Sequence, residues 1–125
     1  MALRVLVVDD NTLVAEDTVA ALTAGGHRAE AVPSAEAVLA RHRAGAWDLV
    51  LTDVRLPGLN GWQLLERLRA LEPRLAVGVL TGWPPLPGEP SAAEMGGSFL
   101  LVKPVDPDEL LRAVERAVPG AVAGG

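Results

Sequence analysis

Residues 3–11 read LRVLVVDDN, and this stretch decides the fold because an apolar run of strand length ends on two carboxylates, Asp9 and Asp10. Three later apolar runs also end on polar side chains: residues 49–51 before Thr52 and Asp53, residues 76–80 before Thr81, and residues 99–102 before Lys103. Parallel strands of one sheet bring their carboxyl ends to the same edge, where open α/β sheets bind ligands. We therefore expect these carboxylates, the hydroxyl and the ammonium to share one crevice.

Segments with helical periodicity separate the apolar runs, which is the alternation expected of βαβ units and a parallel sheet. A modest strand is predicted at residues 27–32. Helices are predicted between Asp10 and Gly25, from the N-cap Ser34 to about Arg43, from the capping pair Asn60 and Gln63 to Pro73, and from Asp106, Pro107 and the capping-box residue Glu109 onward. The helix that begins at Asn60 is expected to carry Leu64, Leu68 and Leu71 on one apolar side.

One segment interrupts this alternation. Residues 82–90 read GWPPLPGEP, and prolines at this density remove backbone donors and exclude a helix interior. At most a short helix is expected at about residues 91–95. The fourth helix of the pattern is therefore predicted to be reduced, with an extended loop in place of much of it.

Composition narrows the class of protein. A chain of 125 residues is most economically one domain, which we place at residues 1–119 with a flexible tail at 120–125. The net charge of −5 argues against direct nucleic-acid binding, and the absence of cysteine excludes a thiolate metal site and a cysteine nucleophile. No apolar run approaches the ~20 residues of a membrane helix. A cytoplasmic protein with no membrane partner is expected.

The three carboxylates indicate the chemistry of the crevice. Carboxylate oxygens suit Mg²⁺, a hard cation that keeps several waters, and a divalent cation relieves the repulsion among Asp9, Asp10 and Asp53. Asp53 is then the predicted nucleophile that attacks phosphorus and becomes an acyl phosphate. Lys103 can contact one phosphoryl oxygen, and the Thr81 hydroxyl can donate to another.

Four motifs in this order resemble those of the receiver domain of bacterial response regulators, which has the CheY-like, flavodoxin-like fold. They are VVDDN at 7–11, LTDVRLPGLNG at 51–61, LTG at 80–82 and VKP at 102–104. The resemblance covers about residues 3–118. It implies an α/β fold with a doubly wound, five-stranded parallel sheet in order 2-1-3-4-5, and a function in two-component phosphorelay signalling.

The resemblance also implies roles for residues of the acidic loops. Asp10 is expected to bind Mg²⁺ directly, Asp9 through a water, and Asp53 and the backbone carbonyl of Arg55 as further ligands. Asp53 is expected to accept the phosphoryl group from the phosphohistidine of a sensor histidine kinase or a histidine phosphotransfer protein. The chain is not expected to be an enzyme beyond catalysing its own phosphorylation and dephosphorylation.

The switch residues follow from the same resemblance. Thr81 and Lys103 are expected to move onto the phosphate and report its presence to a downstream effector that the sequence does not identify. The Lys103–Pro104 bond is expected to be cis, as is usual in the family. The chain would then be a stand-alone regulator, a phosphorelay carrier or a piece of a longer regulator.

Two departures from the family pattern bear on the output. Leu100 stands where the family usually has Tyr or Phe, three residues before the lysine, and Phe99 should point to the opposite face of the strand. An aromatic switch is therefore not expected. The proline-rich segment alters the helix that the family uses for output and dimerisation, so the sequence does not predict the oligomeric state.

Several side chains keep two interpretations. Arg55 and Trp83 either control the access of water to the acyl phosphate or are a solvated arginine and a loop tryptophan packed on prolines. His27 and His42 are expected to be surface or partly packed residues without a catalytic role. Trp47 and Trp62 are expected to shield the core, and the group Glu66, Arg67 and Arg69 to form a solvated helix face.

Two other functions fit part of the sequence. A phosphatase of the haloacid-dehalogenase type would use Asp9 as its nucleophile, but Asp106 and Asp108 begin a helix where that family needs an acidic pair on a strand, and Asp53 would be unexplained. A receiver-fold interaction module with altered switching would fit Leu100 and the reduced fourth helix. Separate substitution of Asp9 and Asp53 would distinguish the two candidate nucleophiles.

Overall fold

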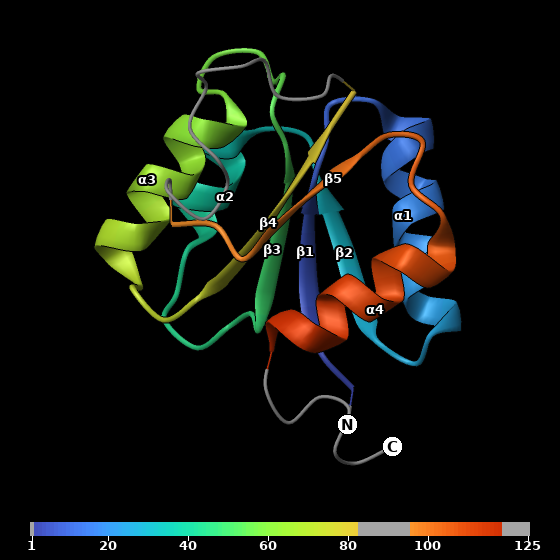
Figure 1. Ribbon diagram of the computed structural model, residues 1–125. Helices are drawn as coiled ribbons and strands as arrows, with labels where there is room; N and C mark the ends of the chain where they lie inside the picture. Colours follow the sequence, from blue (N-terminus) through green and yellow to red (C-terminus); the bar gives the residue numbers. More distant parts are fainter. Residues whose placement is uncertain (1, 83–95, 119–125) are drawn as a thin grey trace.

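The computed structural model describes residues 2–82 and 96–118, which form one parallel sheet with helices on both faces (Figure 1). The elements, in chain order, are β1 (Arg4–Val8), α1 (Thr12–Ala24), β2 (Arg28–Val32), α2 (Ala35–Arg41), β3 (Leu49–Asp53), α3 (Gly61–Leu71), β4 (Ala76–Thr81), β5 (Phe99–Val102) and α4 (Pro107–Ala117). All four strand pairs are parallel, and the order is β2-β1-β3-β4-β5. The predicted fold class and strand order are confirmed. Residues 83–95, the predicted short helix at 91–95 and the predicted tail at 120–125 lie outside the described residues.

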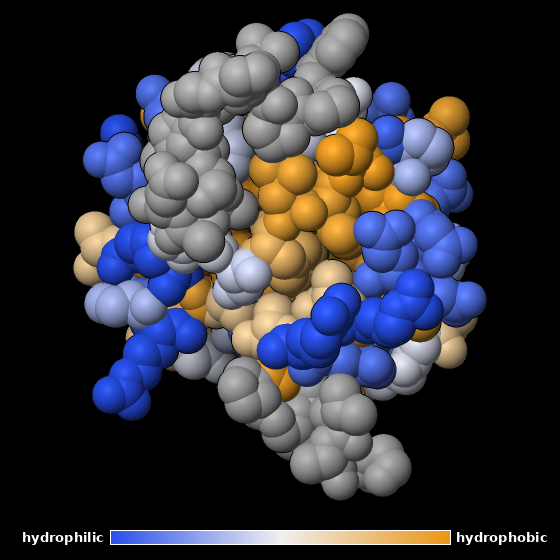
Figure 2. Space-filling view, in the orientation of Figure 1, coloured by the Kyte–Doolittle hydropathy of each residue, from blue (hydrophilic) through white to orange (hydrophobic). Residues whose placement is uncertain are grey.

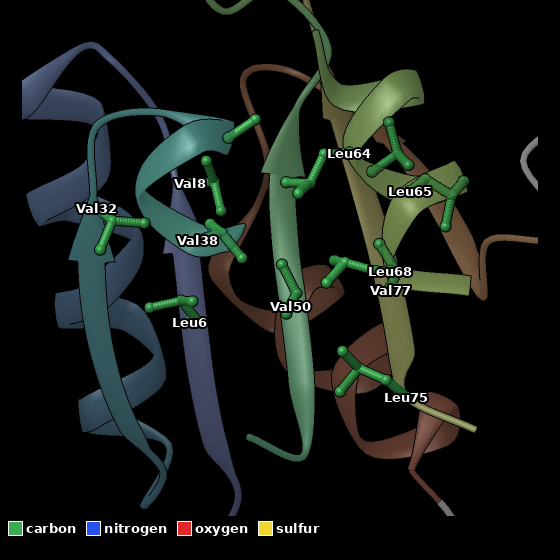
Figure 3. Packing of buried hydrophobic residues seen from close by; sticks show 12 residues of the cluster. Leu6, Val8, Val32, Val38, Val50, Leu64, Leu65, Leu68, Leu75 and Val77 are labelled. Carbon is green, nitrogen blue, oxygen red and sulfur yellow. The ribbon is translucent and has the colours of Figure 1, made fainter. Parts of the chain in front are cut away.

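The sheet has a core on each face because alternate residues of its buried strands point in opposite directions. Leu6 and Val8 of β1 pack with α2 and α3, whereas Val5 and Val7 pack with α1 and α4. Figure 3 shows the first of these cores, in which Leu68 of α3 is fully buried against the sheet. Burying a side chain of this size contributes roughly 1.5–3 kcal/mol, so the two helix layers hold the strand ends in place.

Polar side chains begin the helices as predicted. Ser34 caps α2, and Asn60 and Gln63 form a complete capping box at the start of α3. In α4 the Asp106 carboxylate accepts the Glu109 N–H at 3.1 Å, with Pro107 in the first turn. The return bond from the Glu109 side chain is not formed in the described structure, which is consistent with repulsion between the two carboxylates.

The viewing side of Figure 1 carries an exposed hydrophobic area. Figure 2 shows hydrophobic side chains gathered over β5 at the centre of this side, next to the charged residues of α4. Within the described chain, β5 pairs with β4 on one side, and its Val102 is 41% exposed. In the described ranges no helix is long and apolar enough to cross a membrane.

Three side chains differ from their predicted environments. Leu71 is 54% exposed because the buried stripe of α3 runs through Leu64, Leu65 and Leu68, and Leu71 lies at the edge of that stripe in the last turn. His27 is buried rather than at the surface, because the turn after α1 packs under α4. Arg69 is half-buried and donates to the Pro73 carbonyl, so it does not belong to the solvated face that Glu66 and Arg67 form.

The remaining expectations about packing are met. Trp47 and Trp62 are partly buried against the core that α2 and α3 cover. His42 is half-buried at the opposite end of the sheet from the acidic loops, where its Nε2 lies 3.1 Å from the Glu72 carboxylate. Neither histidine is near the predicted crevice.

Candidate functional site

The carboxyl ends of β1 and β3 bring three acids together. Asp9 and Asp10 follow β1, and Asp53 ends β3, which pairs directly with β1 in the register Val8 to Thr52. One carboxylate oxygen from each of the three lies within 4.8 Å of the others. Asp9 is buried, Asp53 is half-buried and Asp10 is exposed, so the cluster opens to solvent on the side of Asp10. Three oxygen donors with one open side match the donor set that Mg²⁺ takes in proteins.

Lys103 reaches this cluster from β5, two strands away from β3. Its ammonium lies 2.9 Å from Asp9 Oδ2 and 3.2 Å from Asp53 Oδ2. Burial alone would lower the pKa of Lys103, but the hydrogen bond to Asp9 and the charges of Asp53 and Asp9 raise the pKa above its usual value. The side chain therefore stays a cation and offsets part of the negative charge of the three acids.

Asn11 orients the buried carboxylate. Its backbone N–H donates to Asp9 Oδ1 at 2.9 Å, and its own side chain accepts the Val14 N–H as the cap of α1. Asp9 thus has one oxygen on a backbone amide and the other on Lys103. From the sequence, Asn11 was assigned only to the VVDDN motif; its place one residue before the helix was the signal for its capping role.

Thr81 lies at the same edge of the sheet. It ends β4, it is buried, and its backbone carbonyl accepts the Lys103 N–H at 2.7 Å. The two candidate phosphate ligands are thereby tied together by the β4–β5 pairing. The Lys103–Pro104 peptide bond is cis, the isomer expected from the resemblance.

The loop after Asp53 connects β3 to α3 and is attached at both ends by backbone bonds. The Val54 N–H donates to the Leu80 carbonyl at 3.2 Å, and the Gly61 N–H donates to the Val54 carbonyl at 2.9 Å. A Cβ at Gly61 would lie 2.2 Å from the Asp53 carbonyl oxygen, so only glycine lets the helix begin this close to the strand end. Arg55, the predicted carbonyl ligand, lies in this loop, next to the acidic cluster in sequence.

Leu100 and Phe99 point to opposite faces, as predicted. Leu100 packs against the core on the side of α2 and α3, whereas Phe99 packs on the other side. Gly78 of β4 makes room for Phe99, because a Cβ there would lie 2.2 Å from the Phe99 ring. Trp83, the second predicted modulator, lies outside the described residues.

A groove of about 580 Å³ adjoins the cluster at Lys103. Its walls come from α1, from Leu80 of β4, from the segment between β5 and α4, and from the start of α4, which contributes Pro107 and Leu110. Leu13 of α1 is 74% exposed one residue before Val14. A partner that lies in this groove would contact Lys103, whose ammonium lies 3.2 Å from Asp53.

Comparisons with known proteins identify the family of this chain. The family model of the response regulator receiver domain matches residues 5–115. The chain is 37% identical over 124 residues to the response regulator protein FleR of Pseudomonas aeruginosa, covering 99% of this chain and 26% of that protein. It is 33% identical over 114 residues to the DNA-binding transcriptional regulator NtrC of Salmonella typhimurium, covering 91% of this chain and 24% of NtrC. The chain thus spans about a quarter of the length of these curated relatives.

Solved structures share this fold. A CheY-like response regulator receiver domain protein from Methanospirillum hungatei superposes with a TM-score of 0.87 at 28% identity, covering 100% of both chains.

Proposed function

Since this chain belongs to the family of response regulator receiver domains, the receivers of two-component systems, we propose that its phosphoacceptor is Asp53. The phosphoryl donor is the phosphohistidine of a sensor histidine kinase or of a histidine phosphotransfer protein. An oxygen of the Asp53 carboxylate attacks phosphorus, the bond from phosphorus to the histidine nitrogen breaks, and an acyl phosphate forms on Asp53. The chain catalyses this transfer and the later hydrolysis on itself and turns over no other substrate.

The cation site supports this proposal through its donor set. Asp9, Asp10 and Asp53 offer only oxygen ligands, and the Arg55 carbonyl would supply another. We assign Asp10 and Asp53 as direct ligands and Asp9 as a ligand through water, because Asp9 already accepts bonds from Asn11 and Lys103. Bound Mg²⁺ would neutralise charge on the transferred group.

Lys103 and Thr81 then act on the phosphoryl group itself. The Lys103 ammonium, 3.2 Å from Asp53 Oδ2, is a point charge beside the attacking carboxylate and can follow the new phosphate oxygens. The Thr81 hydroxyl can donate to another of these oxygens. Because a leucine, Leu100, packs against the core at the aromatic position of the family, the signal in this proposal passes through Thr81 and the following loop without rotation of a ring.

One observation carries the proposal: acids that follow or end two strands have carboxylate oxygens within 4.8 Å of one another, and the Lys103 ammonium lies 2.9 Å from Asp9 and 3.2 Å from Asp53 at the same sheet edge. Incubation with acetyl phosphate and Mg²⁺, followed by intact-mass analysis, tests it. We expect one phosphoryl adduct on the parent, and none on Asp53→Asn or in excess chelator. An adduct that persists in Asp53→Asn would show that the acceptor is another residue, with Asp9→Asn as the next variant to measure.

The groove beside Lys103 is where we place the phosphodonor. Its mixed lining on α1 (Val14, Asp17, Thr18 and Ala21) and its contact with Lys103, which lies 3.2 Å from Asp53, suit a helix that presents a phosphohistidine. Leu13, exposed at the start of α1, would add apolar contact to that helix. In this arrangement Leu13→Ala slows transfer from a partner protein and leaves transfer from acetyl phosphate unchanged.

The haloacid-dehalogenase alternative has little support in the geometry. The Asp106 carboxylate is occupied as the cap of α4, and Asp9 is held by Asn11 and Lys103. Asp53, which that mechanism leaves without a role, is the nucleophile in our proposal.

A further inference from the structure

The middle of the loop between β3 and α3 is held by a side chain from another helix. Backbone bonds of Val54 and Gly61 attach the ends of this loop, and the Asn60 N–H donates to the Gln63 side chain at 2.9 Å. Between these ends, the Leu59 N–H donates at 3.0 Å to Oε2 of Glu36, a residue of α2. Glu36 therefore bridges α2 and the loop that follows Asp53.

Gly58 shows how closely the Glu36 carboxylate approaches the loop. Gly58 has φ of +76°, which favours glycine, and a Cβ built there would lie 2.3 Å from Glu36 Oε2 and 3.1 Å from its Cδ. Both the conformation and the space at Gly58 thus match a carboxylate seated against the backbone of residues 58 and 59.

The charge of Glu36 suits this position. Its pKa is lowered first by the hydrogen bond from the Leu59 N–H, then by its own backbone N–H, and further by the charge of Arg67. Glu36 also lies in the first turn of α2, where the helix dipole favours an anion. It contributes nothing to the core, because the residue is exposed.

We propose that Glu36 is a positioning residue for the cation site, which it serves by holding the loop that carries the Arg55 carbonyl. The inference rests on the proposed function, since it assigns Arg55 as a ligand. Without Glu36, the loop keeps the backbone bonds of Val54 and Gly61 but loses the bond at Leu59, so we expect the loop to position the Arg55 carbonyl less well for a cation at the acidic cluster. Cation affinity then falls although all three acids are intact.

The test is a titration of the metal-free protein with Mg²⁺ alone. NMR chemical shifts of the backbone amides of residues 9–11 and 53–55 report binding at each Mg²⁺ concentration. We expect Glu36→Ala to raise the Mg²⁺ dissociation constant roughly tenfold, at the low end of the losses found when a partner of a metal ligand is removed. Glu36→Gln keeps an oxygen acceptor for the Leu59 N–H, so it should raise the Mg²⁺ dissociation constant less than Glu36→Ala does. Glu66→Ala removes the same charge from the exposed side of α3 and should change it less than twofold, which separates positioning from net charge.

A second variant acts on the same loop from the other side. Gly58→Ala places a methyl group against the Glu36 carboxylate at a positive φ, and it should also raise the Mg²⁺ dissociation constant. Thermal unfolding of each variant shows which of them are folded at the titration temperature.

The outcomes distinguish this inference from the proposed function. A parent protein that neither binds Mg²⁺ nor becomes phosphorylated overturns the proposed function. A parent that does both, with Glu36→Ala and Gly58→Ala binding Mg²⁺ within twofold of it, overturns the role of Glu36 alone.

Discussion

The Lys103 ammonium lies 3.2 Å from the Asp53 carboxylate although β4 separates their strands in the sheet. The long lysine side chain spans this gap, and Asp9 holds its end at 2.9 Å. In the absence of a cation, Lys103 therefore supplies the positive charge of the acidic cluster. We therefore expect Lys103 to compete with Mg²⁺ for Asp53 and to contact a phosphoryl oxygen after transfer.

This double role gives Lys103→Ala two opposite effects. Phosphorylation of Asp53 by acetyl phosphate should slow by about 100-fold, the loss typical of one preorganised donor. Mg²⁺ binding should become tighter by roughly fivefold, because about 1 kcal/mol of charge repulsion is removed. Intact-mass time courses and Mg²⁺ titrations measure the two effects.

Lys103→Arg is the control for this prediction, because it keeps the charge and changes the shape. Weaker Mg²⁺ binding in Lys103→Ala would contradict the competition.

Lys103 is the sole lysine of the sequence, so acylation of side-chain amines reports the exposure of Lys103 directly. Acylation of Lys103 should be faster in Asp9→Asn than in the parent, because this variant removes the shorter of the two ion pairs of Lys103.

The repulsion among the acids predicts that Asp10→Asn stabilises the metal-free protein. Removal of one of three clustered carboxylates should raise the free energy of unfolding by about 1 kcal/mol, or about 4 °C in melting temperature. In saturating Mg²⁺ the parent should melt higher than the variant, because the cation binds the parent more tightly. Melting curves in chelator and in Mg²⁺ check this reversal; a variant less stable than the parent in both media would count against the shared cation site.

The core predicts a contrast between two leucines of one helix. Leu68→Ala should cost about 2–5 kcal/mol because Leu68 is fully buried beneath α3. Leu71→Ala should change stability by less than about 0.5 kcal/mol because Leu71 is 54% exposed. Urea unfolding of both variants measures the difference, and equal losses would mean that α3 packs differently.

Gly78 and Phe99 form a pair whose substitutions should not be additive. Gly78→Ala places a methyl group against the Phe99 ring and should cost about 1–3 kcal/mol. The double variant Gly78→Ala with Phe99→Leu should regain part of the lost stability, because the smaller leucine side chain leaves space for the added methyl group. The four proteins form a double-mutant cycle, read by urea unfolding; strict additivity would show that the two residues do not touch.

Acid should weaken the attachment of β1 to the segment before β3. Asp48 is partly buried, which opposes its ionisation, but the side chain and backbone N–H of Arg4 lower its pKa below the usual value. A carboxylate whose pKa is lower in the folded state stabilises the fold above its unfolded pKa and loses that effect as pH falls through the folded pKa. The parent should therefore lose more stability than Asp48→Asn in that range. Melting temperatures across pH, compared with the exposed-site variant Asp108→Asn, test this.

Several errors of the sequence-based predictions have a common cause. Leu71 follows Leu64 by two helical turns, and its spacing alone indicates burial, yet the core does not extend under the last turn of α3. His27 comes after two glycines in what resembles a surface turn, yet α4 covers it, with Glu115 3.6 Å from its Nε2. Periodicity reports which side of an element is apolar and carries no information on which other element reaches it.

Glu36 was missed for a related reason. In sequence it is an acidic residue in the first turn of a helix, which needs no further explanation. Only the packing of α2 beside the loop after Asp53 brings its carboxylate to the Leu59 amide. The capping residues Ser34, Asn60 and Asp106 were found because each bonds within its own helix end.

The sequence by itself determined the alternation of strands and helices, the caps, and the set of polar residues at the strand ends, because each depends on neighbours along the chain. Strand order was implied by the family resemblance, and the parallel pairing then placed Asp9, Asp10, Asp53 and Lys103 at one edge. The tertiary structure alone decided which carboxylate Lys103 holds, that Asp9 is buried while Asp10 is open, and that Glu36 secures the loop after Asp53. These features depend on distances between side chains far apart in sequence, which hydrophobic packing of the two helix layers sets.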